Sequence, residues 1–120
     1  MKIAFTTSGT ELDAPLDRRF GRSPGFLLYD LEHMTFEAAD NKQNMNAAQG
    51  AGIQSAESVV RLGAEALVTG HCGPKAFKVL QAAGVKVFNT DSKTIAEALD
   101  HYRTGELTEA KAADVESHWA

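Results

Sequence analysis

The sequence predicts a single α/β domain in which helices cover a five-stranded mixed sheet. Short apolar runs bounded by turn residues recur along the chain, and this pattern indicates strands. In the second half these runs alternate with amphipathic helical patterns, which indicates βαβ units and therefore parallel strands. In the first half two runs are joined by a connection of hairpin length, so that pair is antiparallel.

Composition limits the function classes. The 120 residues suffice for one hydrophobic core, and the formal net charge of −4 argues against non-specific binding to nucleic acid. No apolar run is long enough to span a bilayer and no signal-peptide pattern follows Met1, so we expect a cytoplasmic protein. The single cysteine excludes an internal disulfide and a four-cysteine metal site within one chain.

The first half of the chain contains three predicted strands, at Lys2–Thr7, Gly25–Leu31 and Met34–Ala39. The first ends in the small polar residues Ser8 and Gly9, whose N–H and hydroxyl groups are candidates to line a ligand, although a simple strand exit explains them equally well.

A long loop, residues 10–24, separates the first two strands and carries Arg18, Arg19 and Arg22. Long loops in compact domains are often functional, and arginine presents planar donors to anions. We expect at least one of these arginines to bind a ligand; the alternative is that Asp17 pairs with one and the others are solvated.

Residues 40–49 form a polar, asparagine-rich crossover that leads into Gly50 and Gly52 and then a helix. Ile53, Ala56 and Val60 are predicted to face the core. Paired glycines before a helix allow a ligand to approach the backbone closely. The third glycine of a dinucleotide fingerprint and the Gly-Lys-Ser/Thr of a phosphate loop are both missing, so neither of those sites is supported.

The centre of the protein is predicted at residues 65–77, where a buried strand at residues 66–68 is followed by a glycine-bracketed turn and a helix that begins at Pro74. His71 and Cys72 lie in this turn, between Gly70 and Gly73. A helix start favours an anion, so a thiolate, an imidazole and an anion-favouring position coincide. The alternative is a well-formed turn with a structural, half-buried cysteine.

The last strand is predicted at Val85–Asn89, and a capping box at Thr94 and Glu97 starts the last helix, with His101 on its solvent side. Residues 106–120 form a polar C-terminal tail, either frayed helix or disordered, so the domain is placed at residues 1–105. The predicted strand order is 3-2-1-4-5, with strand two antiparallel. The strand ends at Ser8–Gly9, residues 70–72 and residues 89–90 then share one edge of the sheet, where open α/β proteins bind ligands.

The motifs at residues 19–22, 50–52 and 70–77 resemble those of the dinitrogenase iron–molybdenum cofactor-binding family. The resemblance covers residues 1–105 and is nearest to members that carry a molybdenum–copper sulfide cluster. It implies a ribonuclease H-like fold and a carrier of an anionic molybdenum-containing sulfur cluster, or a related molybdenum or iron–sulfur cluster, without turnover chemistry. His71 and Cys72 are then the metal-contacting candidates, and the remaining candidate cluster-binding residues are Ser8, Gly9, Arg19, Arg22, Gly50, Gly52, Gly70, Gly73 and Lys75.

Two other functions stay open. One is a protein-interaction or regulatory module, for example for a nucleotide-dependent ATPase, although no residue identifies such a partner. The other is an enzyme that uses Cys72 as a nucleophile beside His71. A ribonuclease H-like nuclease is disfavoured, because it needs carboxylates around Mg²⁺ and the first strand, Lys2–Thr7, carries none.

Overall fold

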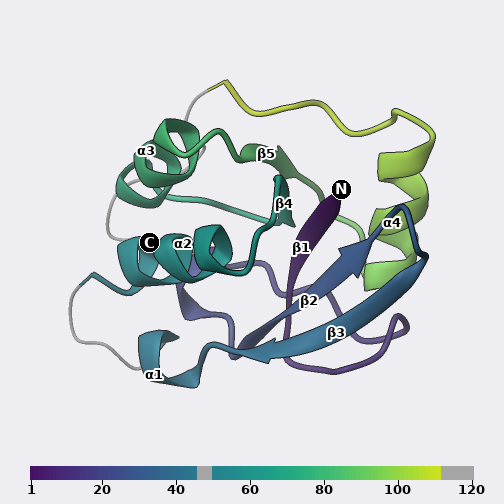
Figure 1. The fold of residues 1–120 in the computed structure, drawn as a ribbon, viewed down its shortest axis with the longest axis horizontal. Coiled ribbons are helices and arrows are strands. Elements are labelled where there is room, and N and C mark those ends of the chain that lie inside the picture. The colour runs from purple at the N-terminus through teal and green to yellow at the C-terminus, as the bar shows by residue number, and fades with distance from the viewer. Residues whose placement is uncertain (46–49, 112–120) are drawn as a thin grey trace.

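The computed structural model describes residues 1–45 and 50–111 and forms one five-stranded sheet in the order β3-β2-β1-β4-β5 (Figure 1). The strands are β1 (Lys2–Thr7), β2 (Gly25–Asp30), β3 (Thr35–Asp40), β4 (Ala66–Thr69) and β5 (Lys86–Asn89). β2 is antiparallel to both of its neighbours, whereas β1, β4 and β5 run parallel to one another. The predicted strand order and the antiparallel second strand are confirmed.

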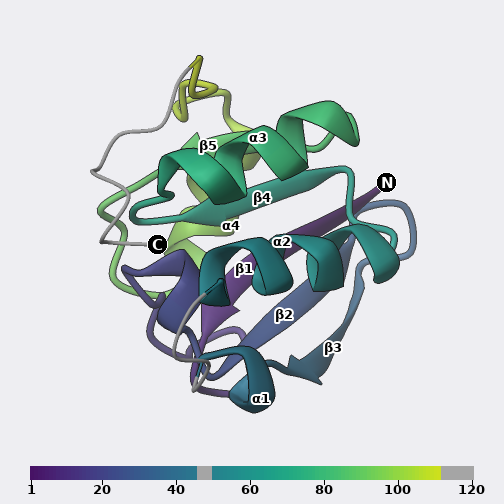
Figure 2. The same ribbon diagram turned by 90° about the vertical axis from the view of Figure 1, so that its left-hand side faces the viewer.

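The helices lie on both faces of the sheet. α2 (Ala51–Arg61) and α3 (Pro74–Ala82) cover one face, and α4 (Ile95–Arg103) covers the other (Figure 2). Within residues 1–45 and 50–111, no helix combines the length and the apolar character that a membrane span requires.

The central strand β1 is buried on both faces because helices cover both sides of it. Ile3 and Phe5 pack with Ile95 of α4, whereas Ala4 belongs to the cluster formed with α2 and α3. Parallel strands in such sheets are expected to be apolar throughout, and the apolar residues of β1 and β4 follow that rule.

Two short helices lie where the sequence predicted irregular chain. η1 (Phe20–Arg22) is a 3-10 turn inside the loop of residues 10–24, and α1 (Lys42–Met45) lies in the polar crossover. The N–H of Lys42 donates to Asp40 Oδ1 at 2.9 Å, so a side-chain turn precedes α1 where no apolar periodicity marks a helix. Residues 46–49 of the crossover lie outside the described residues.

The buried face of α2 differs from the prediction. Val59 is fully buried and Val60 is 37% exposed, so the assignment of Val60 to the core was wrong. The buried positions are Ala51, Gly52, Ser55, Ala56 and Val59. Most of these residues are small and only weakly apolar, so the buried face of α2 gives a weak hydropathy pattern, and the spacing from Ile53 and Ala56 led to Val60 in place of its neighbour Val59.

The loop after β1 is held against the end of that strand by buried threonines. The Thr6 hydroxyl donates to the carbonyl of Asp17 at 2.7 Å and shares a second hydrogen bond with Thr69 Oγ1 at 2.9 Å. The N–H of Asp17 donates back to the carbonyl of Thr6 at 2.7 Å. These contacts fix the position of the arginines that follow Asp17.

The residues after α4 continue the domain beyond residue 105. The N–H of Ala110 donates to the carbonyl of Val87 at 2.7 Å, and Glu109 forms an antiparallel bridge with Phe88. Leu107 packs against the apolar cluster around α4. Glu109 and Ala110 therefore lie along the outer edge of β5; residues 112–120, the rest of the predicted tail, lie outside the described residues.

We expect Thr6→Val to lower the free energy of unfolding by about 1–3 kcal/mol, because it leaves the buried Thr69 hydroxyl and the Asp17 carbonyl short of a partner. Urea denaturation measures the loss. The matched control is Thr35→Val at an exposed position of β3, which should change stability far less; equal losses in the two variants would contradict the role given to Thr6.

The turn between β2 and β3 gives a prediction about pH. Asp30 accepts hydrogen bonds from the His33 ring at 2.9 Å and from the N–H groups of His33 and Glu32, and these bonds lower the pKa of Asp30 to about 2. Because the folded-state pKa is depressed, this contribution to stability is present above the ordinary pKa of 3.8 and is lost as the pH falls toward 2. Carboxyl NMR should show a midpoint near 2, rising in His33→Asn; a wild-type midpoint near 3.8 would contradict this turn geometry.

Candidate functional site

The predicted central unit forms as a strand, a turn and a helix. β4 ends at Thr69, α3 begins at Pro74, and Gly73 occupies the N-cap position with an extended backbone. The N–H groups of Lys75 and Ala76 lie in the first turn of α3, where backbone donors lack partners within the helix. The start of α3 therefore presents donors and the positive end of the helix dipole.

The segment Arg18–Arg22, which we call the arginine loop, pairs with this turn through the backbone. The N–H of His71 donates to the carbonyl of Arg18 at 2.7 Å, and the N–H of Phe20 donates to the carbonyl of His71 at 3.1 Å. Arg19 and His71 thus form a parallel bridge. These bonds place the arginine loop beside the turn, as the sequence analysis required for a shared site.

Gly70 is required at this contact. A Cβ atom at position 70 would lie 2.6 Å from the carbonyl oxygen of Arg18 and 2.7 Å from its Cα. Both are backbone atoms, so a side chain here would push the loop away from the turn. Gly70 therefore allows the turn after β4 and the arginine loop to approach each other closely.

The start of α2 lies at the same edge of the molecule. η1 packs against α2, and the side-chain amide of Asn41 donates to the carbonyl of Ser23 at 2.9 Å and to Ser55 Oγ at 3.0 Å, which ties the end of η1 to α2. Gly50 caps α2 with a positive φ of 76°, and Gly52 is buried in its first turn. Figure 2 shows that α2 and α3 begin on the same side of the molecule.

We call this region the helix-start edge. It comprises Arg19–Arg22 of the arginine loop, the start of α2 at Gly50–Gly52, and the central turn with the start of α3 at His71–Lys75. Lys75 is exposed there and Arg22 is half-buried. The predicted gathering of these segments is present in the structure, whereas a role in cluster binding for each residue stays a prediction.

Cys72 is the most deeply buried of the candidate side chains. It is 1% exposed and belongs to the apolar cluster that includes Phe20, Ala76 and Phe77. Its Sγ lies 3.8 Å from the carbonyl oxygen of Gly73. Direct metal ligation by Cys72 therefore stays a prediction, and it would require the turn to open, whereas the half-buried His71 is accessible without such a change.

Ser8 and Gly9 line a different cavity from Gly70 and His71. They line a cavity of about 300 Å³ at the end of β1, together with Pro24, Asp40 and Lys42. The N–H of Gly9 donates to Thr7 Oγ1 at 3.1 Å, so that donor is engaged within the loop. The structure does not bring Ser8 and Gly9 into the cavity that the central turn lines.

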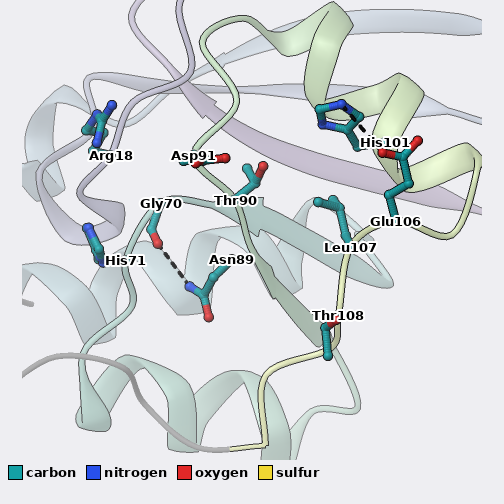
Figure 3. Close-up of a pocket in the computed structure, with 10 residues that line it drawn as sticks. All are labelled: Arg18, Gly70, His71, Asn89, Thr90, Asp91, His101, Glu106, Leu107 and Thr108. Carbon is teal, nitrogen blue, oxygen red and sulfur yellow. Dashed lines mark hydrogen bonds and ion pairs between the residues drawn. The ribbon is translucent and has the colours of Figure 1, made fainter.

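A larger cavity, of about 670 Å³, opens on the α4 side of the central turn (Figure 3). It is lined by Arg18, Gly70, His71, Asn89, Thr90, Asp91, His101, Glu106, Leu107 and Thr108. Arg18 and His71 lie on one side of it, with His101 and Glu106 on the opposite side. We call it the α4 cavity.

Several residues of the α4 cavity were not among the predicted site residues. Asp91 follows β5 directly, so the strand-end rule that singled out residues 89–90 could have included it. His101 was expected on the solvent side of its helix, but it is half-buried in the cavity wall. Glu106 and Thr108 reach the cavity only because the chain turns back along β5 after α4, and no local sequence signal predicts that return.

A chain of hydrogen bonds crosses the wall of the α4 cavity. Thr90 Oγ1 lies 2.7 Å from Ser92 Oγ, and Ser92 Oγ lies 3.0 Å from Nδ1 of His101. Nε2 of His101 is 3.9 Å from a carboxylate oxygen of Glu106. Ser92 itself is buried, so its hydroxyl bonds to these protein groups and not to solvent.

The family model described as dinitrogenase iron-molybdenum cofactor matches residues 1–105. The chain belongs to this family. The apo form of the orange protein from Desulfovibrio gigas is 38% identical, covers 95% of this chain and 96% of its own, and superposes with a TM-score of 0.92. The ribonuclease H-like α/β arrangement inferred from the family resemblance thus matches a solved relative over nearly the whole chain.

Two further relatives agree with this assignment. A Thermotoga protein provisionally named NifB is 34% identical, with 90% of this chain and 91% of that chain covered and a TM-score of 0.79. An uncharacterized protein of Methanocaldococcus jannaschii is 27% identical over 109 residues, which is 89% of each chain.

We expect Gly70→Ala to separate the arginine loop from the turn, because the added Cβ would collide with the Arg18 backbone. Overpacking of this kind costs about 1–3 kcal/mol. Amide hydrogen exchange should show lost protection at His71 and Phe20, whose N–H groups make the bridging bonds.

Gly63→Ala is the control for Gly70→Ala. Gly63 has a positive φ of 83° and open space around its Cβ position, so the substitution strains the backbone without touching the loop. Protection at His71 and Phe20 should persist in it. Full protection of both amides in Gly70→Ala would show that the contact is not required.

Proposed function

We propose that this protein binds and carries an anionic molybdenum-containing sulfur cluster at the helix-start edge. The observation that carries the proposal is the backbone pairing of Arg18–Phe20 with His71, which puts a cationic loop beside the turn that leads into α3. Membership of the iron–molybdenum cofactor family supports the class of ligand. The likeness to the orange protein supports a molybdenum–copper sulfide as the form of cluster.

The groups at this edge suit a sulfur-rich anion. Arg19, Arg22 and Lys75 supply positive charge, and arginine binds anions through planar N–H donors. The first turns of α2 and α3 supply backbone donors and positive dipole ends. Because the whole chain has a net charge of −4, local charges must attract the anion.

A cluster whose metals are fully coordinated by sulfide needs no thiolate from the protein. This fits the burial of Cys72, since charge and N–H donors alone can then retain the cluster. Imidazole also suits copper, so His71 is the accessible candidate for a direct metal contact.

A carrier role is favoured over catalysis by Cys72. A nucleophilic cysteine must be accessible to its substrate. Cys72 is packed among Phe20, Ala76 and Phe77. These surroundings support a structural thiol in a protein that holds its ligand without turning it over.

We expect the triple variant Arg19→Gln, Arg22→Gln, Lys75→Gln to retain at least tenfold less cluster than wild type, because charge-assisted hydrogen bonds contribute about 1.5–3 kcal/mol each. Apo protein is incubated without air with tetrathiomolybdate and copper(I) and then desalted. Retained molybdenum and copper are measured by elemental analysis and by the visible absorption spectrum.

The matched control removes the same charge elsewhere, with Arg61→Gln, Lys2→Gln and Lys86→Gln at exposed positions. It should retain as much metal as wild type. Equal retention by the two triple variants would remove the helix-start edge as the site, and a wild-type protein that takes up no metal would overturn the carrier function itself.

A further inference from the structure

The α4 cavity contains chemistry that the proposed cluster site does not use. It shares His71 with the helix-start edge, but its opposite wall comes from α4 and from residues 106–108. His101 stands in that wall, bonded on one ring nitrogen to Ser92 and near Glu106 on the other. Histidine is the side chain that ordinarily changes charge between pH 5 and 8.

The charges that face His101 come from each element around the cavity. Glu106 follows α4, Asp91 lies in the connection from β5, Arg18 belongs to the arginine loop, and His71 to the central turn. With both imidazoles neutral, two carboxylates oppose one guanidinium, and the cavity disfavours anions. A proton on His101 alone balances the carboxylates, so the net repulsion of an anion disappears.

The hydroxyl chain responds to the same proton. In the tautomer of neutral His101 that carries its proton on Nε2, the nitrogen nearer Glu106, Nδ1 is an acceptor. Ser92, which has one hydroxyl proton, then donates it to Nδ1, and Thr90 donates its own proton to Ser92.

When His101 is protonated, Nδ1–H donates to Ser92 and the direction of the chain reverses. Ser92 now donates to Thr90, and the Thr90 hydroxyl proton becomes available to the cavity that Thr90 lines. Protonation thus adds a positive charge and turns a cavity hydroxyl into a donor, and both changes favour an anion.

We propose that the α4 cavity binds a small tetrahedral dianion, an oxyanion or its thio counterpart, with uptake of one proton by His101. Arg18, Thr90 and Thr108 approach the cavity from three different segments, which suits a compact ligand with acceptors in several directions. Apart from His71, the cavity uses no residue of the helix-start edge, and the proposal does not require that a cluster bind there.

Sulfate and molybdate are the probes, and sulfate does not itself titrate between pH 5 and 8. Isothermal titration calorimetry in two buffers of different ionisation enthalpy measures proton uptake directly. Wild type should take up a proton as it binds the anion, and its dissociation constant should rise with pH by up to about tenfold per unit.

His101→Gln keeps a side chain that can bond to Ser92 but cannot take up the proton. It should abolish proton uptake and reduce the pH dependence to less than twofold between pH 6 and 8. The matched control is His33→Gln on the β2–β3 turn, where His33 is exposed and also pairs with a carboxylate; it should keep the wild-type profile.

Thr90→Val should weaken binding at pH 6 and have little effect at pH 8.

Amide NMR shifts locate the probe. Binding in the α4 cavity should move the resonances of residues 89–91 and Thr108 at pH 6. Three results would overturn the proposal: no binding of either anion at pH 6, a wild-type pH profile in His101→Gln, or shifts confined to the starts of α2 and α3. None of these readouts involves the sulfur cluster, so a failed cluster reconstitution would leave this test unaffected.

Discussion

The arrangement of both candidate sites depends on one backbone contact, the pairing of the arginine loop with the turn after β4. Two hydrogen bonds, from His71 to Arg18 and from Phe20 to His71, join segments that are about fifty residues apart in the sequence. The threonines at the ends of β1 and β4 hold the base of the loop. Because this contact needs Gly70, a position without a side chain determines where the cationic groups lie.

The sequence predicted the sheet and the helix starts because local chemistry determines them. Pro74 occupies the first turn of α3, and Thr94 caps α4 by accepting from the N–H of Glu97 at 3.2 Å, as the capping box indicated. The strand order followed from the hairpin and the right-handed crossovers. The helix-start edge was also predictable, because strand ends and helix starts of parallel units must meet at one side of a sheet.

The α4 cavity could not be predicted in the same way, because it depends on tertiary contacts. The helical phase of His101 predicted a side chain in solvent, yet His101 contacts Ser92 and Glu106 and lies in the wall of the α4 cavity. Glu106 and Thr108 belong to a stretch without periodicity, which joins the fold through Leu107 and Ala110. Val60 shows the same limit: its helical spacing from Ile53 and Ala56 placed it on the core face, whereas the fold buries its neighbour Val59.

The bridge between Glu109 and Phe88 has a consequence for where this protein can be cut. β5 is the last strand of the sheet, and an uncovered strand edge is a template for pairing with other chains. A recombinant fragment that stopped at residue 105, the limit of the family match, would lose this cover together with Glu106 and Thr108. Its solubility would fall with the loss of the cover, so the smallest fragment that behaves like the native protein extends at least to Ala110.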